Sequence, residues 1–77
     1  MQTAAPGSSS QMIVESPVDD ATYNVLMALA SKLEAIDTYR KYANDGKNGE
    51  LWQQLAQADR KHADQLLEEL RSCLNLR

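Results

Sequence analysis

The sequence has one cysteine, two prolines and three glycines in 77 residues, and its longest uninterrupted apolar run covers only residues 25–30. A single cysteine excludes a disulfide within the chain. A run of six apolar residues is far shorter than the roughly 20 that span a bilayer as a helix, so we expect no membrane partner. Residues 1–10 carry no Lys or Arg and no apolar segment, which argues against a secretory signal and predicts a cytoplasmic protein.

Basic residues are absent from residues 1–31, which carry Glu15, Asp19 and Asp20, whereas residues 32–77 carry eight basic and eight acidic residues. That second part is neutral overall and has no basic stripe of the kind that binds nucleic acid, so we expect no nucleic-acid partner. The length allows one domain. A domain this short usually needs a disulfide, a metal or a partner to be stable.

Residues 1–15 are mostly small and polar, and they include Pro6 and Gly7. Such a segment cannot bury enough apolar surface to offset its ordering entropy, so we expect a flexible tail here and a folded domain over residues 16–77. The tail contains one apolar patch, residues 12–14 (Met-Ile-Val). This patch is either part of an unstructured leader or a segment that docks on the folded part or on a protein partner.

The first predicted helix covers about residues 19–44, a stretch of good helix formers without internal proline or glycine. Ser16, followed by Pro17 and by Asp19 three positions on, forms a capping-box pattern at its start, and Asp20 is an alternative cap. Residues spaced three and four apart mark one face of this helix. They are Val25, Leu26, Leu29, Leu33, Ile36, Arg40 and Ala43.

Six turn formers, residues 44–49, separate this helix from a second one predicted over about 49–74. Gly46 can adopt the left-handed conformation that ends a helix, and Asn48 can cap the next one. The stripe on the second helix consists of Trp52, Leu55, Asp59, His62, Ala63, Leu66, Leu70 and Cys73.

Two helices joined by a short turn predict an all-α fold, an antiparallel helical hairpin. A hairpin has a single shared seam, and several apolar residues lie beyond it: Leu26, Met27, Tyr42, Leu67 and Leu74. We therefore expect two hairpins to dimerise into a four-helix bundle, so that the protein is a homodimer or a larger homo-oligomer.

Polar residues interrupt the predicted seam. Asp59 lies at the middle of the second helix's stripe and His62 near it, while Lys32 and Tyr39 border the stripe of the first helix. An unpaired buried charge costs several kcal/mol, so we expect these four residues to form a polar core layer in which each has a partner.

The spacing of Asp59-Arg60-Lys61-His62 resembles the Glu-x-x-His element of the ferritin-like superfamily, and residues 29–39 resemble that superfamily's first helix. The resemblance covers about residues 21–74. It is closest in size to the short two-helix members, encapsulated-ferritin-like and rubrerythrin-like, which dimerise to complete a four-helix bundle. In that family each hairpin supplies a Glu and a Glu-x-x-His to hold two irons.

The sequence departs from this di-iron pattern. The first-helix ligand of the family commonly stands seven residues before the Tyr that matches Tyr39, and Lys32 occupies that position. Lysine offers no lone pair to a cation. Asp59 replaces the second-helix Glu, and Glu34 faces away from the stripe of its helix.

Two interpretations of the polar residues follow. Asp59 and His62 are either ligands of iron, manganese or zinc, or members of a structural layer in which Asp59 pairs with Lys32 and His62 bonds alongside. The second is favoured. It predicts a noncatalytic dimer without a cofactor that acts as a binding or assembly module. The alternatives are a ferritin-like metal protein that stores iron or reduces peroxide, and an adaptor that binds a partner through its tail.

Overall fold

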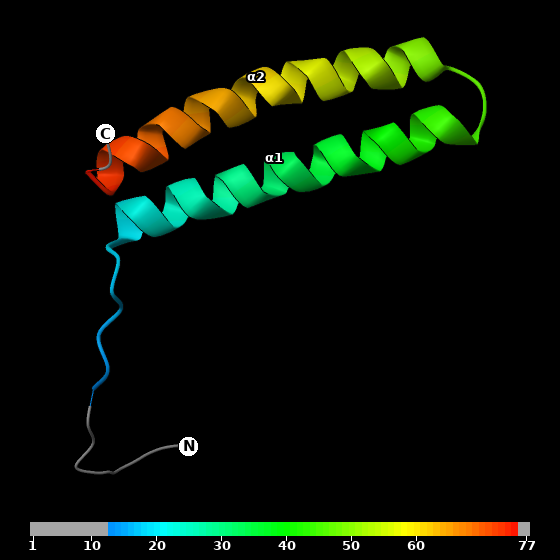
Figure 1. The fold of residues 1–77 in the computed structure, drawn as a ribbon. Helices are drawn as coiled ribbons and strands as arrows, with labels where there is room; N and C mark the ends of the chain where they lie inside the picture. Colours follow the sequence, from blue (N-terminus) through cyan, green and yellow to red (C-terminus); the bar gives the residue numbers. More distant parts are fainter. Residues whose placement is uncertain (1–12, 76–77) are drawn as a thin grey trace.

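The computed structural model describes residues 13–75, and over this range the chain forms two helices, α1 (Asp20–Asp45) and α2 (Gly49–Cys73), and no strand. The helices pack antiparallel as a hairpin, with the end of α2 beside the start of α1 (Figure 1). The predicted all-α hairpin is therefore confirmed. Each helix ends within one residue of the range expected from the sequence.

The start of α1 is capped by Asp19, and not by either of the two residues proposed from the sequence. The Asp19 carboxylate accepts a hydrogen bond of 2.8 Å from the backbone N–H of Thr22. This bond lowers the pKa of Asp19. Asp20 occupies the first turn of the helix, where its charge is favourable to the helix dipole, and the Ser16 hydroxyl accepts instead from the Val18 N–H at 3.2 Å. The cap is therefore Asp19, the acid directly before the predicted alternative Asp20.

The turn between the helices also differs from expectation. Gly46 has a φ of 169°, which is extended backbone, so it does not provide a left-handed end to α1. Asn48 has the left-handed conformation, with a φ of 66°, and its side chain makes no capping hydrogen bond. Its carbonyl accepts from the Trp52 N–H at 3.2 Å. The reversal of the chain therefore uses an asparagine at the start of α2, a residue type that tolerates this conformation.

The contact between the helices follows a regular alternation of three- and four-residue steps, the spacing of a coiled-coil seam. On α2, every residue that is at least partly buried follows this spacing. On α1, Ala35 and Thr38 are also partly buried, and they lie beside the seam. The seam of α1 is Thr22, Val25, Leu29, Lys32, Ile36, Tyr39 and Ala43. The seam of α2 is Gly49, Trp52, Ala56, Asp59, Ala63, Leu66, Leu70 and Cys73.

The predicted stripe of α1 is confirmed for Val25, Leu29, Ile36 and Ala43 and wrong for its other three residues. Leu26, Leu33 and Arg40 are exposed, and Lys32 and Tyr39, expected at the border, lie in the seam. On α2, Leu55 and His62 are exposed beside the seam. The prediction placed Leu26, Leu33 and Leu55 in the stripes because they are apolar, but these leucines lie on the sides of the hairpin that flank the seam.

The closed end of the hairpin is held by aromatic rings. Trp52 stacks on Tyr39 with a centroid separation of 5.8 Å, and its edge meets Tyr42 at 5.1 Å. Such pairs add about 0.5–1.5 kcal/mol each beyond the area they bury. In the described range, neither helix is both long and apolar enough to cross a membrane.

Candidate functional site

An ion pair lies at the middle of the seam. The Lys32 ammonium donates to Asp59 Oδ1 at 3.1 Å and joins α1 to α2 across 27 residues of sequence. The Asp59 side chain is only 12% exposed and the Lys32 side chain 38% exposed, so the carboxylate lies inside while the lysine stem reaches it from the rim. The pairing that the sequence favoured between these two residues is present.

His62 stands one turn after Asp59 and contacts the same oxygen. Its Nδ1 lies 3.2 Å from Asp59 Oδ1, and its side chain is 54% exposed. An ionised carboxylate only accepts, so the imidazole carries its proton on Nδ1 and leaves Nε2 toward the surface. The hydrogen bonds from His62 and then from Lys32 lower the pKa of Asp59, against an opposing effect of burial.

The four residues predicted to form a polar core layer are not all together. Lys32, Asp59 and His62 share one oxygen atom. Tyr39 lies two helical turns further along α1, about 10 Å by the rise of a helix, and stacks on Trp52. The sequence pattern could not separate Tyr39 from Lys32, because both residues belong to the seam of α1.

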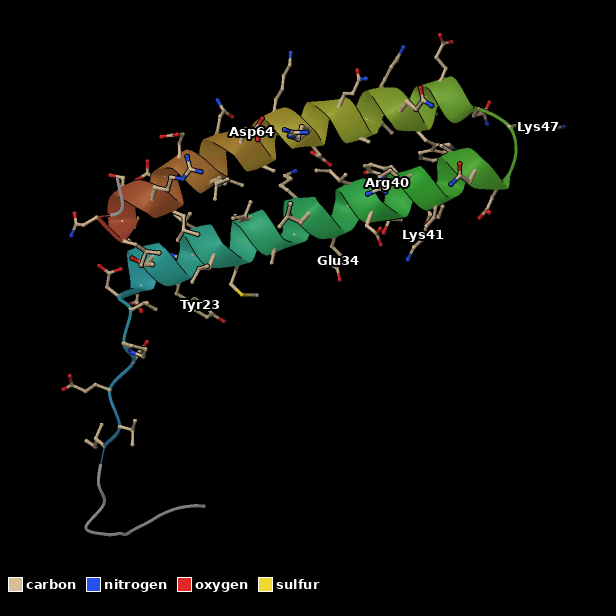
Figure 2. The ribbon with its side chains drawn as sticks, viewed as in Figure 1. Tyr23, Glu34, Arg40, Lys41, Lys47 and Asp64 are labelled. Atoms are coloured by element: carbon tan, nitrogen blue, oxygen red, sulfur yellow. The ribbon has the colours of Figure 1, made fainter. Side chains whose placement is uncertain are left out.

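In one chain, two side chains that could bind a cation, Asp59 and His62, lie beside the ammonium of Lys32. A metal needs lone pairs, and Asp59 Oδ1 already accepts from two donors, one of them an ammonium that repels cations. Between residues 13 and 75, no group of three or more His, Cys, Asp and Glu side chains is placed to hold a metal ion. Glu34, the remaining carboxylate considered, projects from α1 away from α2 (Figure 2).

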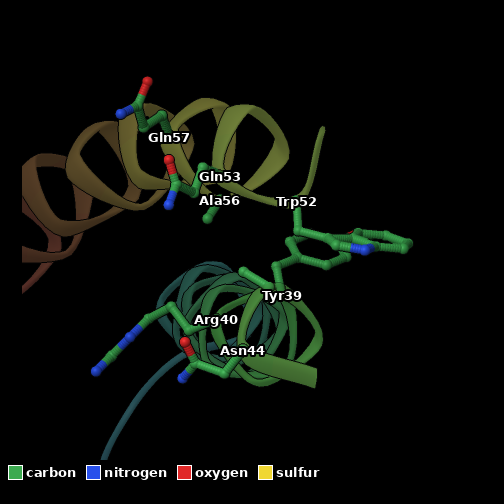
Figure 3. A pocket seen from close by; sticks show the side chains of 8 residues that line it. Tyr39, Arg40, Asn44, Trp52, Gln53, Ala56 and Gln57 are labelled. Atoms are coloured by element: carbon green, nitrogen blue, oxygen red, sulfur yellow. The ribbon is translucent and has the colours of Figure 1, made fainter. Parts of the chain in front are cut away.

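Two exposed surfaces flank the seam, and their positions follow from the helical register. Arg40 and Gln53 each follow a seam residue, and both line one cavity of about 290 Å³ beside the Tyr39 and Trp52 rings (Figure 3). On both helices, a residue that directly follows a seam residue in the sequence therefore lies on this side of the hairpin. Tyr42 and Leu55 precede seam residues and lie on the opposite side.

The first surface, here the neutral face, has no charged member, and Glu34 lines a hollow beside Ala35, Thr38 and Tyr42. It lies toward the closed end of the hairpin and exposes Tyr42, Leu51 and Leu55 among small side chains. His62 borders it, so the polar cluster opens onto this side. The neutral face consists of Ala35, Thr38, Tyr42, Leu51, Leu55 and Ala58.

The second surface, here the leucine face, covers the open end of the hairpin on the other side of the seam and the adjacent outer side of α1. Tyr23 points away from α2, as does Glu34 (Figure 2). Its apolar members are Tyr23, Leu26, Met27, Leu33, Leu67 and Leu74. Asp19 and Arg40, which stand seven residues before Leu26 and seven after Leu33, are the charged residues in the same row of α1. A seven-residue spacing, from Leu26 to Leu33 and from Leu67 to Leu74, is the signal in the sequence that the prediction missed.

No family model, curated protein or solved structure matches this chain. The resemblance to ferritin-like proteins therefore stays a prediction, and any function rests on the geometry above. The structure describes only part of the apolar patch predicted in the tail. Ile13 and Val14 are exposed, and Met12 lies outside the described residues.

The ion pair predicts a pH-dependent effect of Lys32→Met. The substitution should lower the melting temperature by several degrees at pH 7, because the Asp59 carboxylate loses its ammonium partner. Since the pKa of Asp59 is lowered from 3.8, its stabilisation is present above that value and fades as the pH falls through the lowered pKa. Circular dichroism melts should therefore show the two proteins converging at low pH. Lys61→Met, at an exposed position, is the control and should melt like the wild type; a gap that persists at low pH would contradict the account.

Proposed function

We propose that this protein is a noncatalytic, ferritin-like assembly module: a hairpin that dimerises into a four-helix bundle and binds a further partner. The observation that carries the proposal is the small interior. Among the described residues, Ala63 is the one apolar residue that is buried, while eleven large apolar residues are exposed. A hairpin of this kind gains its stability by covering that surface with other chains.

The neutral face is the better surface for self-association. A two-fold axis brings each residue near its own copy or its neighbours, so a face without charge avoids repulsion between like groups. Its small residues, Ala35 and Ala58, allow close approach beside Leu55. The leucine face has charged residues beside its leucines, Asp19 and Arg40 on α1 and Arg60 and Arg71 on α2, which a second copy would have to cover.

Pairing through the neutral face also covers the polar cluster. His62 borders this face, and Lys32 and Asp59 lie near the middle of their helices, so two clusters would meet near the axis. The charges then form a polar layer in the bundle. Layers of this kind can set the register of helices, and we assign that role to Lys32 and Asp59.

A matched pair of leucines tests this assignment. Leu55 on the neutral face and Leu26 on the leucine face are each 38% exposed. Leu55→Ser should weaken self-association by roughly tenfold or more, because an apolar side chain covered in the dimer is lost. Leu26→Ser should leave it unchanged. Sedimentation equilibrium measures both; the reverse pattern would assign the dimer to the other face.

A second candidate function is the ferritin-like metal-binding role, with iron, manganese or zinc held by Asp59 and His62 of two chains. One observation favours it: a carboxylate on Nδ1 of a histidine is also the arrangement that orients metal-ligating imidazoles through Nε2. This role needs Lys32 to leave Asp59.

Added metal separates the two functions. If the ion pair is structural, the melting temperature of chelator-treated protein should not rise with manganese, iron or zinc concentration. A metal-binding protein would instead gain stability in proportion to the logarithm of free metal. Native mass spectrometry provides the second measurement. Stoichiometric metal in the wild type that is lost in Asp59→Ala would overturn the noncatalytic proposal in favour of the metal-binding one.

A further inference from the structure

The leucine face carries a row of four α1 residues spaced seven apart: Asp19, Leu26, Leu33 and Arg40. Seven residues are about two turns of a helix, so the row runs along one side of α1, beside the seam. Leu26 and Leu33 are both exposed at the surface of the hairpin. The row therefore has an apolar middle and a charge at each end, an acid at the start of α1 and a base near its end.

The two end charges of this row have no ionic partner within the described part of the chain. Arg40 and Asp19 take part in no ion pair there, and the Asp19 carboxylate accepts a hydrogen bond from the Thr22 N–H. Asp37, one turn before Arg40, is paired with Lys41 at 3.1 Å instead. Asp19 and Arg40 lie about 31 Å apart by the rise of a helix, so they cannot pair within one chain.

The charged residues that α2 adds to this side are already paired. Arg60 lies 3.2 Å from Asp64, and Arg71 lies 3.3 Å from Glu68. Each pair joins two residues of the same helix and adds no net charge. A surface that satisfies the row on α1 therefore needs a base at one end, an acid at the other and apolar side chains between them.

A second copy of the same row has this order when it runs antiparallel. A two-fold axis that crosses α1 between Leu26 and Leu33 places Leu26 of each chain beside Leu33 of the other. The same axis places Asp19 of each chain beside Arg40 of the other. A parallel arrangement would put acid against acid and base against base. Because charges that flank a helical seam set the orientation of the partner, they select the antiparallel copy.

The two ends of the leucine face also complement each other in shape. At the closed end of the hairpin, Arg40, Gln53 and Ala56 line the cavity of about 290 Å³ (Figure 3). At the open end, Leu74 follows α2 and is 42% exposed. An antiparallel copy brings the open end of each hairpin to the closed end of the other, so Leu74 of one chain meets this cavity of its partner.

We propose that the leucine face binds the leucine face of a second copy in antiparallel orientation, with Asp19 of each chain paired to Arg40 of the other. This inference rests on the proposed function, because it makes the further partner of the assembly module another dimer of the same chain. The neutral face forms the dimer, and the leucine face joins dimers. A dimer paired through its neutral faces exposes two leucine faces, so species beyond the dimer contain even numbers of chains.

Charge variants of the row test this pairing by sedimentation, at concentrations where the wild type forms species larger than the dimer. Arg40→Glu should weaken the association of dimers by about tenfold or more, because it puts two acids together at each end of the interface. Asp19→Asn keeps a residue type that caps helices and removes only the charge, so it should weaken the association by less. Lys47→Glu makes the same change of charge as Arg40→Glu in the exposed turn, and as the control it should have no effect.

The double variant gives the most direct result. In the Arg40→Glu background, Asp19→Asn should strengthen the association because it removes a repulsion, whereas in the wild type it removes an attraction. This reversal requires contact between position 19 and position 40, which only a second copy provides. An effect of Asp19→Asn in the same direction in both backgrounds would overturn the proposal. A wild type that forms no species beyond the dimer at millimolar concentration would overturn it as well.

Leucine variants keep this contact apart from the proposed dimer. Leu26→Ser should leave the dimer intact and remove the larger species, while Leu55→Ser should dissociate the dimer. If Leu55→Ser has no effect and the reversal persists, the proposed dimer is wrong and the leucine-face contact stands. A dimer that depends on Leu55 and is indifferent to the charges at positions 19 and 40 contradicts the leucine-face contact and leaves the proposed function intact. Helicity measured by circular dichroism shows that each variant is folded before its association is compared.

Discussion

Two helices share one seam, and this constraint governs the rest of the molecule. Each helix can turn only about a third of its surface toward the other, so most apolar residues outside the seam stay exposed in a single chain. Thr22, Asp59 and Ala63 are the buried residues of the described range, and only Ala63 is apolar. A core this small contributes little against the ordering of about 50 helical residues, and this imbalance is the basis for proposing that further chains cover the flanking faces.

Within that seam, the ion pair of Lys32 and Asp59 joins the two helices near their middle. A carboxylate at an inward position must find a donor, and the only seam partner within reach on α1 is an ammonium. His62 adds a second donor from the surface side. The positive charge of Lys32 lies 3.1 Å from the carboxylate, so the charge of Asp59 is balanced within one chain.

The sequence predicted the helices, the ion pair and most residues of the seam, and it misplaced five exposed residues in the stripes: Leu26, Leu33, Arg40, Leu55 and His62. The hairpin followed from periodicity and from the six turn formers, and the pairing of Lys32 with Asp59 followed from the cost of leaving a seam charge unpaired. The side of α1 that lies against α2 could not be derived from the sequence. Leu26 and Leu33 are as apolar as Leu29, so the pattern does not show which of these leucines face α2. Asp19 and Asp20 are equally good caps by type, and only the backbone geometry separates them.

The central claim is that the hairpin is folded only as part of an assembly. Sedimentation equilibrium combined with circular dichroism over a range of protein concentrations tests it most directly. The account predicts that helicity and mass fall together on dilution and that the melting temperature rises with protein concentration, since association stabilises the folded state by mass action. A fully helical monomer at micromolar concentration, with a melting temperature independent of concentration, would contradict it.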